Sequence, residues 1–173
     1  MSMTGIDSKD LASNTAFHQE RRTFIIGLGL LTVLAGCGTV APIGSGAGAS
    51  NSAADTLGRI RSAAGRSGLA PDNQLERAAL QQAGYMAGAK RMTHTTGWRK
   101  DFASRVDGND IKGAAAENIA EGRMDIRRLF EMWMDSPPHR RNILDARFTR
   151  FGLAYVRDGK NPEWRYWALL LGK

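Results

Sequence analysis

Two histidines and one glutamate, far apart in the sequence, have the clearest capacity for chemistry in this chain. His94, Glu117 and His139 lie in three separate segments, and the two histidines are the only ones beyond residue 36. Two neutral imidazoles and a carboxylate are sufficient ligands for Zn²⁺ and leave one coordination position for water. If the fold brings them together, they could bind a divalent metal ion, whose water could attack an acyl or phosphoryl centre.

The same three residues also allow a purely structural interpretation. No motif such as H-E-x-x-H ties them together, so their geometry depends on the tertiary fold. Glu117 would then accept hydrogen bonds from one or both histidines and from backbone amides, because buried polar groups need partners. No Gly-x-Ser-x-Gly element and no thiol follow residue 37, so serine and cysteine chemistry lack support.

The amino-terminal segment is typical of an export signal. Residues 1–20 are polar, Arg21 and Arg22 form a basic pair, and Thr23 to Ala35 form an apolar stretch. This stretch is too short to span a bilayer as a helix but suits the apolar core of a signal peptide. The alternative is a buried core helix, but the order of the segments favours a signal peptide over residues 1–36. The sequence does not distinguish the general export route from the twin-arginine route.

The signal ends in a candidate anchor. Leu34-Ala35-Gly36-Cys37 resembles the bacterial lipoprotein box, in which the cysteine carries the acyl chains, so we expect Cys37 to attach the protein to a membrane. Cys37 is the only cysteine, so the remaining domain would have no thiol for a disulfide. Gly38 provides no acid for inner-membrane retention, which leaves the outer membrane of a two-membrane bacterium open as the destination.

Composition divides the rest of the chain and limits its partners. Gly, Ala and Ser dominate residues 38–54, which predicts a flexible linker over 37–54 and a single folded domain over 55–173. The formal net charge is +7, and a basic surface attracts anionic lipid, acidic glycans or nucleic acid. Export makes nucleic acid the least expected of these partners, and a solvated basic surface without a partner is the alternative.

Periodicity predicts helices first and strands last. We expect a short helix over 56–64, a second beginning near Pro71-Asp72-Asn73, a third after Asp125 and a fourth beginning at Pro137-Pro138 with Ser136 as its cap. Residues 95–113 predict a loop with short helical pieces. Phe148 to Val156 and Arg165 to Leu171 predict a terminal hairpin. This order indicates an α+β layered domain.

The order of motifs over residues 56–172 resembles the CAP superfamily, the cysteine-rich secretory, antigen 5 and pathogenesis-related proteins, in its disulfide-free bacterial form. The matching segments are Gly68-Leu69-Ala70-Pro71, Met92-Thr93-His94, Ala116 to Gly122, Trp133 to Arg140, Asn142-Ile143-Leu144, Phe148 to Leu153 and Tyr166-Trp167. The resemblance implies a three-layer α-β-α sandwich with a small antiparallel sheet and a large cleft.

Many members of this superfamily line the cleft with two histidines and two acids that can hold a divalent ion. By resemblance, His94 and His139 match the two histidines and Glu117 the first acid, while Ser136 stands where the second acid is usual. The neighbouring carboxylates, Glu131 and Asp135, are displaced around the helix and are not obvious substitutes. The expected cleft is therefore His94, Glu117, Ser136 and His139. Its metal ligands, if a divalent ion such as zinc binds, would be His94, Glu117 and His139.

We therefore expect an exported protein, lipid-anchored in the bacterial envelope, that acts as a binding or envelope-associated module without catalysis. Its ligand would be a lipid or an envelope glycan. A metal-dependent, protease-like hydrolase with His94, Glu117 and His139 as catalytic residues is the first alternative. A protein that binds anionic lipid or glycan surfaces through its basic face is the second.

Overall fold

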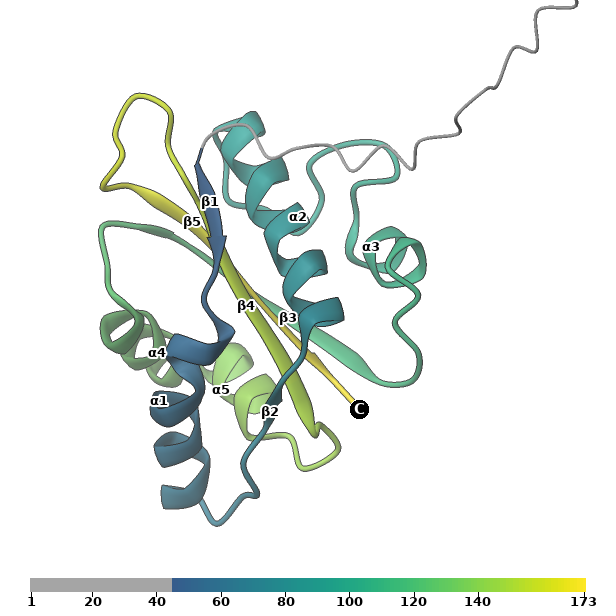
Figure 1. The fold of residues 1–173 in the computed structure, drawn as a ribbon, viewed down its shortest axis with the longest axis vertical. Helices are drawn as coiled ribbons and strands as arrows, with labels where there is room; N and C mark the ends of the chain where they lie inside the picture. The colour runs from purple at the N-terminus through teal and green to yellow at the C-terminus, as the bar shows by residue number, and fades with distance from the viewer. Residues whose placement is uncertain (1–44) are drawn as a thin grey trace, which may run out of the picture. The chain divides into compact units, whose positions relative to one another are not determined.

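The computed structural model describes residues 45–173, and the predicted signal peptide and Cys37 lie outside them. A sheet is covered by helices on both faces (Figure 1). The strands are β1 (Gly46–Gly48), β2 (Ala70–Pro71), β3 (Ala115–Gly122), β4 (Arg150–Arg157) and β5 (Arg165–Gly172). The helices are α1 (Ser50–Ala63), α2 (Asn73–Ala89), α3 (Phe102–Gly108), α4 (Ile126–Asp135) and α5 (Pro137–Leu144). The predicted α-β-α sandwich is confirmed.

The sheet has the order β1-β4-β5-β3, and these neighbours are antiparallel. The short β2 adds a parallel contact to β4, with Ala70 opposite Arg150. The register places Tyr155 opposite Trp167 and Glu117 opposite Leu170. Strand β3 is therefore an edge strand, and its outer edge is available to residues from the helices.

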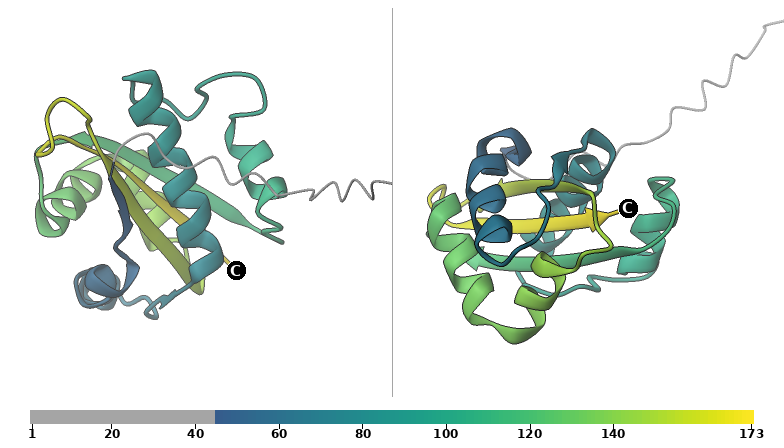
Figure 2. Two further views of the ribbon diagram at one scale, coloured as in Figure 1. Left: turned by 45° about the horizontal axis from the view of Figure 1, so that its top comes forward. Right: turned by 90° about the horizontal axis from the view of Figure 1, so that it is seen from below.

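Alternation along the strands creates one core on each face of the sheet. Trp167, Leu169 and Leu171 of β5 pack with α1, α4 and α5, whereas Tyr166, Ala168 and Leu170 pack with α2. Helices thus cover both faces of the sheet, as Figure 2 shows. A strand that is buried on both faces has a continuous apolar sequence rather than an alternating one. This explains why the sequence of β5 is almost entirely apolar.

Carboxylates begin three of the helices. Asp72 accepts hydrogen bonds from the backbone amides of Gln74 and Leu75, and Asp125 accepts one from that of Arg128. Such caps satisfy amides that the first helical turn leaves without partners. Both starts were predicted, and Asp101 caps α3 in the same way. Ser136 precedes α5 as predicted, but its side chain makes no capping hydrogen bond.

The structure differs from the expected linker. Residues 46–48 form β1, which pairs with β4, and α1 begins at Ser50 rather than near residue 56. Residues 46–54 therefore belong to the folded domain, and the linker prediction was wrong there. Glycine permits a close approach at this point: a Cβ on Gly46 would lie 2.8 Å from a methyl carbon of Val156. The composition that indicated a flexible segment instead permits tight packing against β4.

Within residues 45–173, no helix is long and apolar enough to cross a membrane. The apolar stretch Thr23 to Ala35, which predicts the signal peptide, lies outside this part of the chain. Its role stays a prediction.

Candidate functional site

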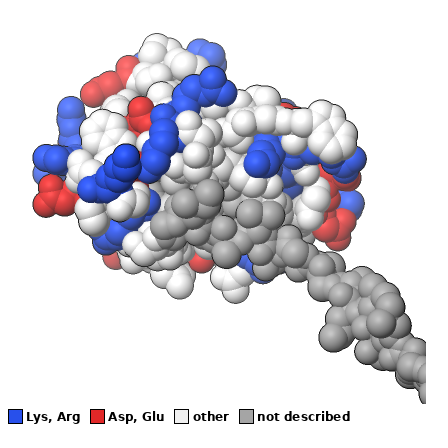
Figure 3. All heavy atoms as spheres, turned by 90° about the horizontal axis from the view of Figure 1, so that it is seen from above, with Lys and Arg blue, Asp and Glu red and all other residues white. Residues whose placement is uncertain are grey.

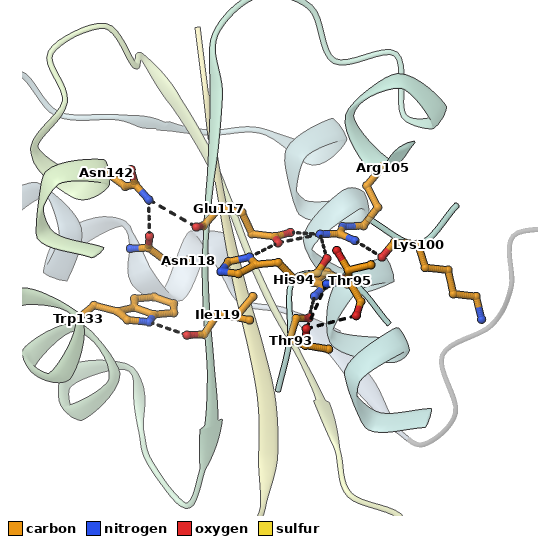
Figure 4. Close-up of polar contacts among 11 residues, drawn as sticks. Thr93, His94, Thr95, Lys100, Arg105, Glu117, Asn118, Ile119, Trp133 and Asn142 are labelled. Atoms are coloured by element: carbon orange, nitrogen blue, oxygen red, sulfur yellow. Dashed lines mark hydrogen bonds and ion pairs between the residues drawn. The ribbon is translucent and has the colours of Figure 1, made fainter. Parts of the chain in front are cut away.

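The candidate site lies along β3. Alternation directs Glu117 and Ile119 toward the α2 and α3 side, and Asn118 toward the α4 and α5 side. Figure 4 shows this division, with His94 and Arg105 beside Glu117 and with Trp133 and Asn142 beside Asn118. Glu117 is 7% exposed and Asn118 is fully buried. An edge strand therefore carries polar side chains into both layers of helices.

A buried arginine compensates the negative charge of the Glu117 carboxylate. Nη2 of Arg105, from α3, lies 2.7 Å from Oε1 and 2.8 Å from Oε2 of Glu117. The Arg105 side chain is only 1% exposed and that of Glu117 only 2%. Removing a carboxylate from water is costly unless a charge or hydrogen-bond donors compensate for it. Arg105 supplies both at once.

His94 completes the arrangement from the loop that joins α2 to α3. Its Nδ1 lies 2.8 Å from Oε1 of Glu117, and because a carboxylate accepts hydrogen bonds, Nδ1 carries the donated proton. The ring nitrogen Nε2 then remains for a ligand. The His94 side chain is 52% exposed. Arg105 also donates to the carbonyl of His94 at 3.2 Å, so one guanidinium positions both the carboxylate and the backbone that presents the imidazole.

On the other side of β3, side-chain amides join the strand to α5. Asn118 donates to the carbonyl of His139 at 3.1 Å, and Asn142 donates to Oδ1 of Asn118 at 2.8 Å. The indole N–H of Trp133 donates to the carbonyl of Ile119 at 3.1 Å. These contacts show that Asn118 and Asn142 hold α5 against the strand. They also place the start of α5 beside the residue that follows Glu117.

His139 lies in the first turn of α5 and is half-buried. Burial, and to a lesser extent the charge of nearby His94, lower the pKa of His139 below its ordinary value. Ser136 lies one turn earlier, where its carbonyl accepts from the Arg140 amide at 2.9 Å. The fold thus brings His94 into contact with Glu117 and places His139 close by. Ser136 has no bond to either.

The donor set does not fit a divalent metal ion. Both oxygens of Glu117 face the guanidinium of Arg105, so an approaching cation would meet an existing positive charge. Ser136 supplies no second carboxylate. Glu131 pairs instead with Arg127 and Arg128 on the exposed side of α4. Across residues 45–173, no group of three or more His, Cys, Asp or Glu side chains is arranged to hold a metal.

Sequence reasoning missed Arg105 and Gln82. Gln82 is fully buried in α2 and donates to the carbonyl of Thr93 at 2.7 Å, fixing the loop that carries His94. A polar residue one turn from Ala79 and Met86, within the apolar stripe of α2, was a readable sign of a buried hydrogen bond. Arg105 gave no such sign, because its partner Glu117 is on another element and no local spacing connects them.

This fold and site define an α-β-α sandwich with a histidine–glutamate pair beside its edge strand. The profile of the cysteine-rich secretory protein family, CAP, matches residues 55–170. The chain therefore belongs to the CAP family, and the resemblance seen in the sequence is confirmed.

A relative and three solved structures are similar to the chain. YkwD of Bacillus subtilis (strain 168) is 44% identical over 45 residues, which are 26% of this chain and 18% of YkwD. The match thus spans less than a fifth of that relative's length. An outer surface protein from Borrelia burgdorferi has a TM-score of 0.66 at 19% identity, covering 76% of this chain and 98% of that one.

Two further structures share the fold. An extracellular protein containing an SCP domain from Bacillus anthracis has a TM-score of 0.64 at 23% identity, over 72% of this chain and 40% of that one. A cysteine-rich secretory protein from Staphylococcus aureus has a TM-score of 0.58 at 20% identity, over 72% of this chain and 38% of that one. At these identities the likeness establishes the fold alone.

Proposed function

We propose that the chain is an exported, lipid-anchored CAP module that binds an envelope ligand at His94 and His139 without a metal ion and without catalysis. The observation that carries the proposal is the contact of Arg105 Nη2 with both carboxylate oxygens of Glu117. This contact commits the carboxylate to an internal partner, so that Glu117 orients His94 rather than coordinating an ion. The site then resembles a fixed hydrogen-bonding surface more than a reaction centre.

The chemistry of the imidazoles suggests a class of ligand. A neutral imidazole presents one donor and one acceptor, and the lowered pKa of His139, caused first by burial, keeps that ring neutral at neutral pH. Hydroxyl groups likewise donate and accept. A hydroxyl-rich ligand, such as an envelope glycan or the head group of a lipid, matches both rings.

Export and anchoring are supported by the order of Arg21-Arg22, the apolar stretch and Cys37. Two of the proteins that share the fold are described as an outer surface protein and as an extracellular protein. A location outside the cytoplasm would bring the domain to envelope glycans and lipids. The lipid anchor rests on Cys37, which lies outside the described residues.

Binding of solubilised envelope glycan by the full chain tests the proposed function. We expect His94→Ala and His139→Ala each to weaken binding, whereas Thr95→Ala, an exposed neighbour in the same loop, should bind as the parent does. If both histidine variants bind glycan and lipid vesicles unchanged, the site does not serve as proposed.

A zinc titration by calorimetry separates this function from a metal-dependent hydrolase. We expect no stoichiometric zinc binding that depends on His94 and His139, because the guanidinium of Arg105 already pairs with the carboxylate of Glu117. Arg105→Gln should release the carboxylate and increase zinc affinity. Tight zinc binding by the parent chain that is lost in Glu117→Gln, together with hydrolysis that is lost in His94→Ala, would establish the hydrolase instead.

A further inference from the structure

The loop between α2 and α3, residues 90–100, concentrates cations and exposed apolar side chains. It contains no acid, and its four basic residues are all exposed: Lys90, Arg91, Arg99 and Lys100. The two large hydrophobic side chains that are exposed within residues 45–173 both lie in it, Met92 at 46% and Trp98 at 87%. Single exposed hydrophobic residues are common, but this loop combines two of them with four cations.

Hydrogen bonds hold the loop from its inner side. Arg105 donates to the carbonyls of Lys100 at 2.9 Å and His94 at 3.2 Å, and Gln82 donates to that of Thr93 at 2.7 Å. Trp98 makes its described contact at the surface, where the guanidinium carbon of Arg99 lies 5.6 Å from its ring centroid. The domain therefore presents the indole outward from a backbone that is fixed at several points.

The loop and the start of the described chain lie at the same end of the domain. The Lys90 ammonium lies 2.5 Å from Oδ2 of Asp158, and the amide of the adjacent Arg157 donates to the carbonyl of Ser45 at 3.0 Å. Asp158 and Arg157 lie at the carboxyl end of β4, and that end of the strand is in the upper part of Figure 1. Seen from above, this end of the molecule carries basic groups in several places (Figure 3).

Chain length restricts how this end could be placed. If Cys37 is acylated, as proposed above, eight residue steps separate it from Ser45, and a fully extended chain spans roughly 26–29 Å over that length. The anchor would then keep the end of the domain that carries residues 90–100 close to the bilayer. This step rests on the proposed anchor, whereas the composition and exposure of the loop do not.

We propose that residues 90–100 form a membrane-docking loop, in which Trp98 and Met92 enter the interfacial region of an anionic bilayer while the flanking cations contact lipid head groups. Indole rings favour the membrane–water interface, and each basic residue near an anionic surface strengthens binding about fivefold. Acidic glycans would match the cations but not the two exposed apolar side chains. The cations, together with the exposed side chains of Trp98 and Met92, therefore favour a lipid surface as the partner of this loop.

The test uses the full chain carrying Cys37→Ser, so that no acyl chain contributes, and vesicles of phosphatidylcholine with or without phosphatidylglycerol. Lipids brominated in the acyl chain should quench tryptophan emission in the anionic vesicles, and Trp98→Phe should remove most of that quenching. Arg91→Gln with Arg99→Gln should weaken binding about 25-fold, at about fivefold per cation. High salt should weaken the parent in the same way.

The control pair is Arg140→Gln with Arg141→Gln, which removes the same charge from exposed positions of α5 and should bind as the parent does. The apolar stretch 23–35 is present in every variant, so its contribution to vesicle binding is the same in all of them. Quenching that persists in Trp98→Phe, or equal weakening by the control pair, would overturn the proposal. So would binding of an acidic polysaccharide that requires Arg91 and Arg99 when vesicles are not bound.

Discussion

At the residue scale, the guanidinium of Arg105 lies against both oxygens of Glu117, so the carboxylate already has a cation as its partner. Arg105 and Glu117 are both almost completely buried, and lysine, arginine and acidic side chains are rarely buried to this degree unless they are paired. The pair has little net charge, yet it fixes His94 through both its ring and its backbone carbonyl. Positioning of the imidazole is therefore the direct consequence of this ion pair.

Arg105→Met should lower the free energy of unfolding by about 3–5 kcal/mol, because it leaves the Glu117 carboxylate buried without its cation. Arg105→Met combined with Glu117→Met should recover part of that loss, since no buried charge then remains. Denaturant unfolding followed by circular dichroism measures both variants. Arg147→Met removes an exposed arginine that pairs with Asp145 and should change little. A double variant no more stable than Arg105→Met would contradict the ion-pair explanation.

His139 should make stability depend on pH. Its pKa in the folded state is lowered, first by burial and then by His94, whereas in the unfolded chain it should lie near the ordinary value of about 6.5. The unfolded state therefore binds a proton more readily. The contribution of His139 to the free energy of unfolding should be fully present above about pH 6.5. It should be lost as the pH falls through the lower folded-state pKa.

Chemical unfolding across this pH range should show a shallower decline for His139→Gln than for the parent. An NMR titration of His94→Ala should show the pKa of His139 moving upward toward its ordinary value. If His139 in the parent titrates at or above that value, the inferred environment of the ring is incorrect.

At the element scale, the position of α2 depends on a glycine in β4. A Cβ added to Gly152 would lie 2.1 Å from the amide nitrogen of Glu76 and from the carbonyl carbon of Leu75. These are backbone atoms, which cannot rotate away as a side chain can. The amide of Asp72 also donates to the carbonyl of Phe151 at 2.8 Å, so the beginning of α2 is held directly against the strand.

Gly152→Ala should therefore destabilise the domain by about 3 kcal/mol or more, because the helix must move away from the sheet. The matched control is Gly58→Ala in α1, where the added Cβ meets nothing within 4 Å. That substitution should stabilise the domain by about 0.5–1 kcal/mol through helix propensity. Thermal and denaturant unfolding distinguish the two, and a neutral effect of Gly152→Ala would contradict the close packing.

The edge strand β3 is protected by side chains rather than by another strand. Trp133 donates to the carbonyl of Ile119, and Asn142 to that of Glu117 at 3.4 Å. An unprotected edge can pair with another chain. Two helices thus satisfy outward carbonyls of β3 at the same positions where they approach the candidate site.

At the scale of the whole molecule, the proposed lipid anchor is Cys37, which lies outside the described part of the chain. Cys37→Ser should abolish fatty-acid labelling and release the protein from the membrane fraction. Release should be complete at high salt, because the proposed docking loop would retain some protein at low salt. Labelling and sedimentation of expressing cells provide the measurement. A variant that is still labelled and still sediments at high salt would disprove the lipoprotein assignment without bearing on the loop.

The sequence by itself determined the family, the layered class and the features that depend on local chemistry. Asp72 and Asp125 precede apolar periodic segments and begin α2 and α4, and the two apolar runs near the carboxyl end form β4 and β5. These predictions succeeded because a cap or a period of apolar residues acts over a few positions. The two histidines stand out by residue type, but Glu117 could be matched to them as a cleft residue only through the resemblance.

The tertiary structure alone decided the features that require a distant partner. The β1 segment Gly46-Ala47-Gly48 becomes a strand because β4 lies beside it, and β3, which has few β-branched residues, is a strand because it pairs with β5. Arg105 is buried because Glu117 comes to it from another element. Burying a charge is favourable only where the compensating charge arrives, and that depends on the folded chain as a whole.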